Sequence, residues 1–448
     1  MYAKLSARIA ATAIGVSLLA AGASAQTPAP ILTIDDAISL ATAGSRTIKV
    51  AALEVTKAGL EVTALHTRRY PYFDLRTLDG TLASSLDFTF KQGVFGNFPQ
   101  IGPVPPVDTS LTTDPQFVGV LSATIAQPLT QLRKVSLGEK ALGVGKQIAE
   151  ERVRKETLAA ANNVRRLYYG IVQAQSGLKA VDEASTMYRE LDRLMGEYVS
   201  RQVVLEADAL QVKTALARQD QTALTLRNTI ATLKEQLNIV LGRDISTDFA
   251  VVDALPAVTP DIGLAEAQER AVAQRPEVRE ARLKAQQAEF DLRLKKEEWM
   301  PEISVGFTYL GMYNFEVLPK NTAALGIMGT WEPWDWGRRK AEADAKARTV
   351  DQASLGVLEA EALIRVDVNS QWRKMQEARA MLAVANLARQ SAAEKLRVAL
   401  ERFKLEAALQ RTVLEAQAAD TEAAQQYQQA LAGFWSARAD FEKALGGS

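Results

Sequence analysis

The sequence predicts an α+β membrane protein built by internal duplication, in which each half joins a strand hairpin to a very long helical hairpin. Three observations predict this fold. Two tracts, 129–255 and 334–448, contain no proline and carry apolar residues at helical spacing. Four other segments alternate apolar with small or polar residues, as two-faced strands do. The first half of the chain also resembles the second half.

The composition excludes several kinds of chemistry. The 448 residues include no cysteine and one histidine, His66, which removes thiol nucleophiles, disulfides and most soft-metal sites. The 53 basic residues balance the 53 acidic ones, so the charge does not indicate a nucleic-acid partner. The segment GVGKQI, from Gly143, lacks the spacing of a phosphate-binding loop. We expect no catalytic residues, no metal site and no cofactor.

The first 25 residues have the pattern of a secretory signal peptide. Lys4 and Arg8 precede the apolar stretch IAATAIGVSLLAAGA, and Ala23, Ser24 and Ala25 form an A-x-A cleavage site. The apolar stretch is shorter than the roughly 20 residues that a transmembrane helix needs. We therefore expect an exported chain that begins at Gln26.

The proline-free tracts predict helical hairpins at about 130–241 and 335–445. Both tracts are rich in Ala, Leu, Glu, Gln, Arg and Lys, which are good helix formers. A helix from about Thr130 to Gly196 would be roughly 100 Å long at about 1.5 Å per residue. Coiled-coil steps of four and three residues occur within them, as at Leu226, Ile230, Leu233, Leu237 and Val240.

Strand hairpins are predicted at about 72–127 and 302–332. In ISVGFTYLGMYN, from Ile303, large apolar residues alternate with Ser, Gly and Thr, and LGIMGTWE alternates similarly. A strand is expected over 78–90, with Leu78 on its apolar face and Asp79 on the other face. The segment FVGVLSATIAQ, from Phe117, is the remaining strand. Five prolines lie within 91–116, so this segment is expected to form a long loop without regular structure.

The duplication sets the predicted domain boundaries. LTIDDAISLATAG, from Leu32, begins a segment that aligns without gaps with one beginning at Ile262, so that Ala37 matches Ala267 and Pro71 matches Pro301. After the hairpins, QPLTQLRK from Gln127 matches EPWDWGRR from Glu332. The first hairpin is therefore about 25 residues the longer. We predict a first repeat over 26–255 and a second over 256–448.

Aromatic residues gather where the predicted strands meet the helices. Outer-membrane β-barrels carry aromatic girdles at the boundary between lipid and water. Seven residues are predicted to form such a belt: Tyr70, Tyr72, Phe73, Trp299, Trp331, Trp334 and Trp336. At the turn from strand to helix, prolines end the strands, Asp335 caps the helix, and two arginines reach the lipid headgroups. This predicted junction comprises Pro128, Pro333, Asp335, Gly337, Arg338 and Arg339.

The number of strands predicts the oligomer. Four strands cannot close a barrel, and open strand edges do not occur in lipid. Three copies supply twelve strands. We therefore expect a homotrimer with a twelve-stranded β-barrel in the outer membrane, continued by a long α-helical barrel in the periplasm.

Over essentially all of the mature chain, the sequence resembles the TolC-like outer-membrane efflux channels. The resemblance rests on TIDDAISLA, WMPEISVG, EPWDWGRR, the two VLEA turns and the duplication. WDWGRR is similar to the family's D-G-G-R-R-type junction, with Trp336 in place of the first glycine. The resemblance implies a passive duct that receives its substrate from an inner-membrane pump, of the RND, ABC or similar class, through a periplasmic adaptor. Drugs, metals and proteins all stay open as substrates.

The helical turns near 198–206 and 403–412 are the expected closing point of the duct, because the long helices reverse there. Opposite charges on the turns are expected to hold the tip shut, although solvated helix ends are an alternative reading. The candidate residues are Tyr198, Arg201, Glu206, Phe403, Glu406 and Arg411. An alternative for the whole protein is a periplasmic coiled-coil adaptor or scaffold without a channel. That alternative explains the helices but not the alternating strands or the aromatic belt.

Overall fold

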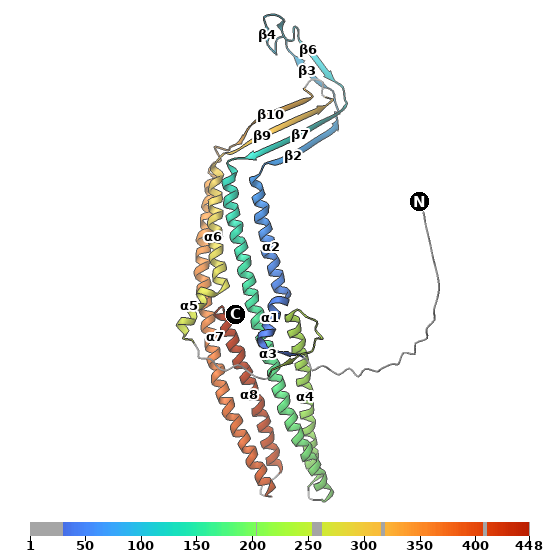
Figure 1. Ribbon diagram of the computed structural model, residues 1–448, viewed down its shortest axis with the longest axis vertical. Helices are drawn as coiled ribbons and strands as arrows, with labels where there is room; N and C mark the ends of the chain where they lie inside the picture. The colour runs from blue at the N-terminus through green and yellow to red at the C-terminus, as the bar shows by residue number, and fades with distance from the viewer. Residues whose placement is uncertain (1–29, 203, 253–261, 315–318, 406–409, 448) are drawn as a thin grey trace, which may run out of the picture.

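The structure is a computed structural model that describes residues 30–202, 204–252, 262–314, 319–405 and 410–447. The predicted signal peptide, 1–25, lies outside the described residues. The molecule is elongated, with a curved sheet at one end and long helices running away from it (Figure 1). In the described residues, no helix is both long enough and apolar enough to cross a membrane.

The main helices and strands follow the same order in the two halves of the chain, and the short strands β1 and β8 occur in the first half alone among the described residues. The first half contains β1 (Ile31–Leu32), α1 (Ile34–Gly44), α2 (Arg46–His66), β2 (Tyr72–Thr81), β7 (Phe117–Pro128), α3 (Gln131–Ser200), α4 (Glu206–Leu241) and β8 (Ala250–Val251). The second half contains α5 (Leu264–Gln274), α6 (Pro276–Lys296), β9 (Glu302–Tyr313), β10 (Asn321–Thr330), α7 (Arg338–Lys404) and α8 (Gln410–Ala444). Corresponding helices have matching lengths: α1 and α5 have 11 residues each, and α2 and α6 have 21 each.

The long helices form where the sequence predicts them. Helix α3 has 70 residues and α7 has 67, so each is roughly 100 Å long at about 1.5 Å per residue. Near the sheet the packing order is α2, α3, α6, α7. Farther away, α4 packs on α3, α3 on α8, and α8 on α7. Helices α3 and α7 take part in both groups of helices, the one near the sheet and the one far from it. They therefore connect the two groups rigidly.

The main core lies at mid-length, where α1 and α5 pack against the long helices. The ring of Trp435 contacts Phe434 edge to face at a centroid distance of 5.5 Å and Tyr169 at a tilt at 6.0 Å. The β1–β8 pair ties the start of the described chain to the segment after α4. A close backbone approach fixes the same region. Helix α4 ends at Gly242, whose φ of 73° is in the left-handed region, and Gly242 lies against Gly44.

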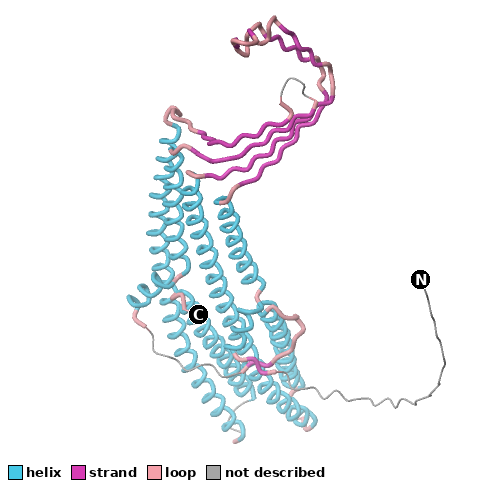
Figure 2. The backbone as a smooth tube through the Cα atoms, turned by 45° about the horizontal axis from the view of Figure 1, so that its top comes forward, coloured by secondary structure: helices cyan, strands magenta, loops and turns pink. Residues whose placement is uncertain are grey.

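The four main strands form one antiparallel sheet in the order β10, β9, β7, β2 (Figure 2). The cross-strand register shows that the sheet has two different faces. One row across all four strands is Phe73, Ile125, Phe307 and Leu325. The next row, on the opposite face, is Asp74, Thr124, Thr308 and Ala324. In these two rows, large apolar side chains share one face, and small or polar ones share the other.

The predicted strand over 78–90 was wrong in two respects. The chain leaves the sheet after Thr81, and a separate strand β3 (Leu86–Phe90) follows a bend. In addition, Leu78 pairs with Val120 and so lies on the face of Asp74, whereas Asp79 lies on the face of Phe73. The local alternation of 78–90 continues smoothly in the sequence. The bend at 82–85 interrupts it in space, so one face cannot be assigned across it.

The segment 91–116 was also predicted wrongly, because it contains regular structure. Strand β3 pairs with β6 (Thr109–Thr113), and β4 (Asn97–Phe98) pairs with β5 (Gly102–Pro103). Gly93, at a positive φ of 74°, lies in the turn between β3 and β4, and Gly102, at 79°, begins β5 directly after the turn from β4. We call residues 82–116 the outer ribbon. It continues from β2 and β7 beyond the sheet and turns back over it (Figures 1 and 2).

Candidate functional site at the strand–helix junction

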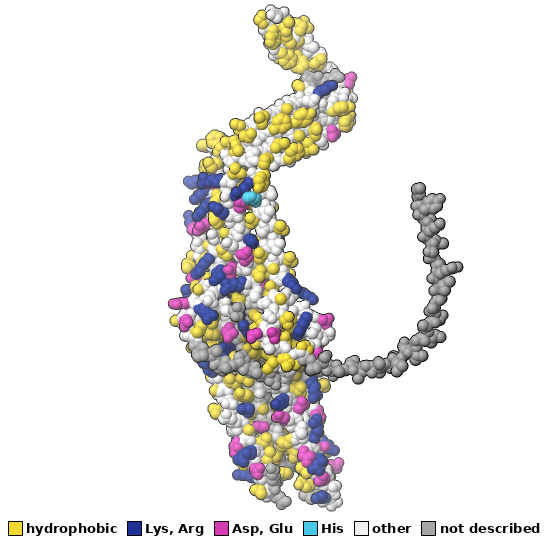
Figure 3. Space-filling model, in the orientation of Figure 1, with side chains coloured by type: hydrophobic (Ala, Val, Ile, Leu, Met, Phe, Trp, Pro, Cys, Tyr) yellow, Lys and Arg dark blue, Asp and Glu magenta, His cyan; other side chains and the backbone are white. Residues whose placement is uncertain are grey.

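The apolar face of the sheet is open to the surroundings of the chain. Phe73, Leu75, Leu325 and Ile327 all expose more than half of their side-chain surface. Figure 3 shows that apolar side chains cover most of the visible surface of the sheet, with a few charged side chains at its far end and many more where the helices begin. An exposed apolar surface of this kind marks an interaction site rather than a water-facing one.

Aromatic residues follow the edge of this apolar surface, at its helical end. The predicted belt residues are all largely exposed: Tyr70, Tyr72, Phe73, Trp299, Trp331, Trp334 and Trp336. Tyr72 is the exception in its direction, because it lies on the face of Asp74 and not on the apolar face of Phe73. Trp334 and Trp336 contact each other edge to face at 5.8 Å. Large rings that pack so little within their own chain are available to an external apolar medium.

Trp336 is held in an unusual backbone conformation. Its φ is 56°, in the left-handed region, and that of Gly337 is 85°. A left-handed conformation costs a residue with a Cβ about 1–2 kcal/mol, but it costs glycine almost nothing. The Trp336 side chain is 90% exposed, so packing within the chain does not offset this cost. The Trp336 ring therefore contributes little to packing within the isolated chain.

Asp335 fixes the first turn of α7. Its carboxylate accepts hydrogen bonds from the backbone N–H groups of Gly337, at 3.1 Å, and Arg339, at 3.0 Å. It therefore caps the helix as predicted, although the N-cap residue itself is Gly337. The bond from Arg339 is the main cause that holds the pKa of Asp335 below its usual value. The carboxylate stays charged at neutral pH.

Arg339 does not reach outward, so its predicted contact with headgroups was wrong. Its side chain is 8% exposed and its guanidinium group lies 2.8 Å from a carboxylate oxygen of Glu332. It also lies over the ring of Trp299 at 6.0 Å. The two left-handed residues that precede α7 rotate its first turn, and this places Arg339 against the protein. Arg338 remains about half exposed.

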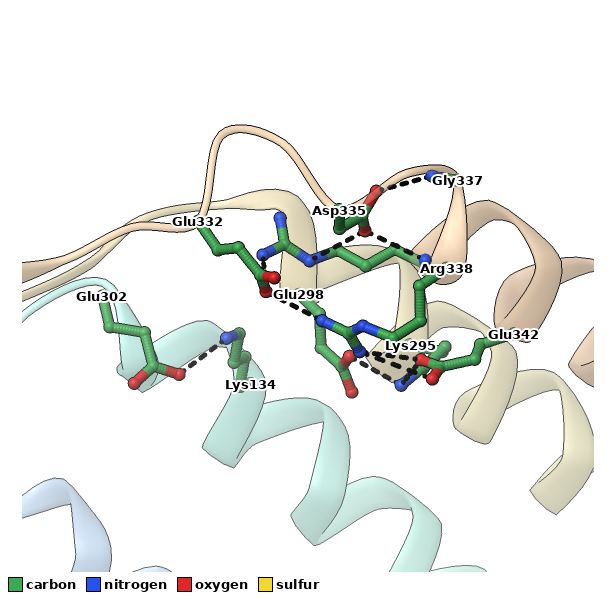
Figure 4. Close-up of polar contacts among 10 residues, drawn as sticks. Lys134, Lys295, Glu298, Glu302, Glu332, Asp335, Gly337, Arg338 and Glu342 are labelled. Carbon is green, nitrogen blue, oxygen red and sulfur yellow. Dashed lines mark hydrogen bonds and ion pairs between the residues drawn. The ribbon is translucent and has the colours of Figure 1, made fainter.

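An ion-pair network connects α6 to the start of α7 (Figure 4). Arg338 pairs with Glu332 at 2.8 Å and with Glu342 at 3.4 Å. Lys295 pairs with Glu342 at 2.6 Å and with Glu298 at 2.7 Å. These contacts, first of all that with Glu298, raise the pKa of Lys295, and the contact with Lys295 lowers the pKa of Glu342. The network therefore stays ionised at neutral pH.

Ion pairs also connect the ends of the other helices that lie next to the sheet. Lys134 of α3 pairs with Glu302 of β9 at 2.9 Å, and Arg133 pairs with Glu297 at 3.1 Å. Glu139 of α3 pairs with Arg69 at the end of α2. Pro128 is the last residue of β7, and the next residue, Leu129, donates its N–H to the carbonyl of Ile303. Each neighbouring pair of helices is thus held together at the end of the sheet. No pattern in the sequence indicates these partners, because they are far apart along the chain.

The polar face of the sheet carries a charged pair that sequence reasoning missed. Arg76 donates to both carboxylate oxygens of Asp74, at 2.8 and 3.2 Å. Thr124 and Thr308 lie beside this pair and share a hydrogen bond of 3.3 Å. Strands β7 and β10 contain no charged residue. The alternation around Asp74 indicated this face, but the register was needed to place it.

Helices α3 and α7 end, and helices α4 and α8 begin, at the end of the molecule farthest from the sheet (Figure 1). Tyr198 packs on a cluster that includes Tyr188, Met195 and Val212. Arg201 follows the end of α3, and Glu206 begins α4. Phe403 lies in the last turn of α7. Glu406 lies outside the described residues.

The charges at the tip make local contacts within one chain. Arg411 pairs with Glu415, one turn along α8, at 2.8 Å. Within one described chain, the ion pair of Arg411 therefore stays on α8 and does not join the two helical turns. The predicted charged tip residues do not form one cluster. In the part of the chain that the structure describes, no group of three or more His, Asp or Glu side chains is placed to bind a metal ion.

Known structures share this architecture. The Campylobacter jejuni CmeC outer-membrane channel matches with a TM-score of 0.73 and 16% identity, over 92% of this chain and 85% of that one. CusC, described as forming a transmembrane channel, matches with a TM-score of 0.74 and 16% identity, over 93% and 92%. The open state of the Neisseria gonorrhoeae MtrE outer-membrane channel matches with a TM-score of 0.71 and 14% identity, over 92% and 89%.

No protein-family profile and no curated protein sequence matches the chain. The chain has the fold of outer-membrane channels, along nearly the whole length of both partners in each comparison. The predicted resemblance to the TolC-like channels is therefore confirmed at the level of the fold.

Proposed function

We propose that three copies of this chain form an outer-membrane export duct, whose sheet lines the membrane pore and whose helices form a tube in the periplasm. The observation that carries this proposal is the identical lateral order of the two layers. The sheet runs β10, β9, β7, β2, and the helices below it run α7, α6, α3, α2. Both layers therefore end on the same two sides of the chain.

The free edges of the sheet are suited to a head-to-tail ring. Strands β2 and β10 each pair on one side only. They run in opposite directions, because the order contains three antiparallel steps. Strand β10 of one copy can therefore pair with β2 of the next and keep the sheet antiparallel throughout. Such a heterologous contact generates a closed ring when the rotation is right, and a closed ring removes the unpaired edges.

The helices beneath these edges expose apolar side chains on the same two sides. On α2 they are Val50, Leu53 and Leu60. On α7 they are Leu355, Leu358, Leu363 and Val366. Burying apolar surface contributes about 25 cal/mol per Å². Contact between α2 and the neighbouring copy's α7 would thus close the tube below the barrel.

The faces of the sheet fit this arrangement. The apolar face, with Phe73 and Leu325, would meet lipid, and the face with Asp74 and Thr124 would line a water-filled pore. The aromatic belt, with Trp336 at its most exposed point, would lie at the periplasmic interface of the outer membrane. A coiled-coil adaptor in the aqueous periplasm would not need a sheet with one exposed apolar face. The two-faced sheet therefore favours the duct over the adaptor.

The resemblance to TolC-like channels supports further partners. We infer that a periplasmic adaptor docks on the helical tube and that an inner-membrane pump delivers the substrate. Of the predicted charged tip residues, the structure describes Arg201, Glu206 and Arg411, and we propose that they narrow the closed duct there. Exposed ion pairs contribute only about 0–1 kcal/mol each, which suits a gate that an adaptor opens. Replacing Arg201 and Arg411 by Ser should raise the conductance, and unchanged conductance would move the constriction elsewhere.

The proposed duct is tested by reconstitution. The purified protein should have three times the chain mass in detergent and should form discrete conducting pores in planar bilayers. Cell fractionation should place it in the outer membrane. A folded monomer that does not conduct, and that salt alone extracts from membranes, would instead support the adaptor.

A further inference from the structure

The outer ribbon carries an apolar surface that remains exposed among the residues that the structure describes. Its exposed apolar side chains, each at least 47% exposed, are Val94, Phe95, Phe98, Ile101 and Val107. Figure 3 shows this surface as a nearly uncharged tip beyond the sheet. Exposed apolar groups at the end of an otherwise polar loop indicate contact with another surface.

The ribbon is an ordered element. The β3–β6 ladder has five residue pairs, and the carbonyl of Val104 accepts the N–H of Phe95 at 2.9 Å. Lys91 and Asp108 pair with each other at 2.8 Å, inside the ribbon. Two of its few charges are therefore satisfied internally. Copies of the ribbon could approach one another without strong repulsion.

The height of the sheet argues against lipid as the occupant. Strand β2 has ten residues; at about 3.3 Å per residue and a tilt of about 40°, such a strand rises roughly 25 Å along the barrel axis. This rise equals the apolar band of an outer-membrane barrel, which is about 25 Å tall. The ribbon starts where the band ends, so it lies outside the membrane core.

The length of the ribbon favours the ribbons of the other two copies as the partners of its apolar surface. Twelve strands spaced about 4.8 Å apart and tilted by about 40° enclose a barrel of roughly 12 Å radius. The five residues of β3 alone span about 17 Å. The strands of the sheet are curved, and the ribbon turns toward the inside of that curve (Figure 2). Strands in a barrel coil around its axis, so this direction leads over the pore.

We propose that the three outer ribbons of the trimer meet over the pore and form an apolar cap on its outer mouth. This inference rests on the proposed trimer. Phe98 and Ile101 lie at the far end of the ribbon and would form the contact on the three-fold axis. The cap would restrict the entry of hydrophilic molecules from outside, and outgoing substrate would have to displace it.

Single cysteines test the contact directly, because the chain has no cysteine of its own. The variant Phe98→Cys, in the full-length trimer, should form covalent dimers on mild oxidation, and reductant should raise its conductance. The control Ser84→Cys sits at the base of the ribbon, near the barrel wall. Copies of that residue would be roughly 20 Å apart on a barrel of about 12 Å radius, so it should not cross-link.

A second variant tests the apolar contact without a cross-link. Phe98→Asp together with Ile101→Asp places six carboxylates near the axis, and their repulsion should raise the single-channel conductance about twofold or more. The mass in detergent is measured first, so that loss of the trimer is distinguished from loss of the cap. An intact trimer in which Phe98→Cys does not cross-link would overturn the proposal. So would quenching of a fluorophore on that cysteine by brominated lipid, because it would place the ribbon in the bilayer.

Discussion

The carboxylate of Asp335 accepts a hydrogen bond from the backbone N–H of Arg339 at 3.0 Å, which joins the end of the sheet to the first turn of α7. The guanidinium group of Arg339 turns back to Glu332 at 2.8 Å. One short segment therefore fixes the direction in which a 67-residue helix leaves the sheet. The same segment carries Trp334 and Trp336 on its outer side, so anchoring and orientation are combined there.

The lowered pKa of Asp335 predicts a dependence of stability on pH. Since the pKa is lower in the folded protein than in the unfolded chain, charged Asp335 stabilises the fold above the unfolded pKa of about 4. That contribution is lost as the pH falls through the folded pKa. Asp335→Asn should lower the thermal stability at pH 7, and its difference from the unmodified protein should shrink at pH 3. Asp344→Asn, an exposed carboxylate on α7, is the matched control; an equal effect there would refute a specific role of Asp335.

Trp336 should be dispensable for folding but not for membrane anchoring. Trp336→Gly removes a left-handed tryptophan, so the protein in detergent should be unchanged or up to about 1–2 kcal/mol more stable. In liposomes, its remaining tryptophans should be less deeply inserted, as judged by quenching with brominated lipids. Trp336→Phe keeps an aromatic ring and should insert normally. A strong loss of stability in detergent for the glycine variant would show that the ring is needed within the chain.

Gly44 should tolerate no side chain. A Cβ at this position would overlap the carbonyl oxygen of Leu241, where α1 meets the end of α4. Gly44→Ala should therefore destabilise the protein by about 1–3 kcal/mol. Gly59→Ala, in the middle of α2, meets nothing within 4 Å and should stabilise the helix by up to about 1 kcal/mol. Urea unfolding of both variants and of the unmodified protein measures these changes. A Gly44→Ala variant as stable as the unmodified protein would mean that the backbone around Leu241 shifts without a cost in free energy.

Asp74 and Arg76 should set the charge of the pore lining. In a trimer, Arg76→Gln leaves three uncompensated carboxylates in the barrel, and the pore should become more cation-selective. Asp74→Asn leaves three arginines and should shift selectivity toward anions. The double variant should return to the unmodified value. Reversal potentials across a KCl gradient measure these shifts, and identical potentials in all four proteins would place the pair outside the conducting path.

The sequence predicted the long helices and the strands of the main sheet, but not the contacts between them or the strands of the outer ribbon. Alternation over Ile303–Phe307 predicted a strand, because every second residue of a strand faces the same side. It did not predict the order of the strands, because pairing depends on residues far apart in the chain. Arg338 and Arg339 are equivalent in the sequence, and only the left-handed turn at Trp336 and Gly337 places one outside and one inside.

The outer ribbon shows a second reason why the sequence alone does not predict the whole fold. Its prolines predict an irregular loop, but the segment forms a paired ribbon in which Gly93 lies in a turn and Pro103 pairs with Asn97 across two short strands. Composition describes which conformations a residue can adopt. It does not show whether two such segments will pair.

The most direct test of the account is whether the two free edges of the sheet meet between copies. Leu75 on β2 and Leu325 on β10 lie on the apolar face at opposite edges. With both replaced by cysteine, a short flexible thiol cross-linker should give covalent dimers and trimers and nothing larger. Each single variant should give at most a trace of dimer. A ladder that ends at monomers or dimers, or one that continues beyond three chains, would contradict the closed three-copy barrel.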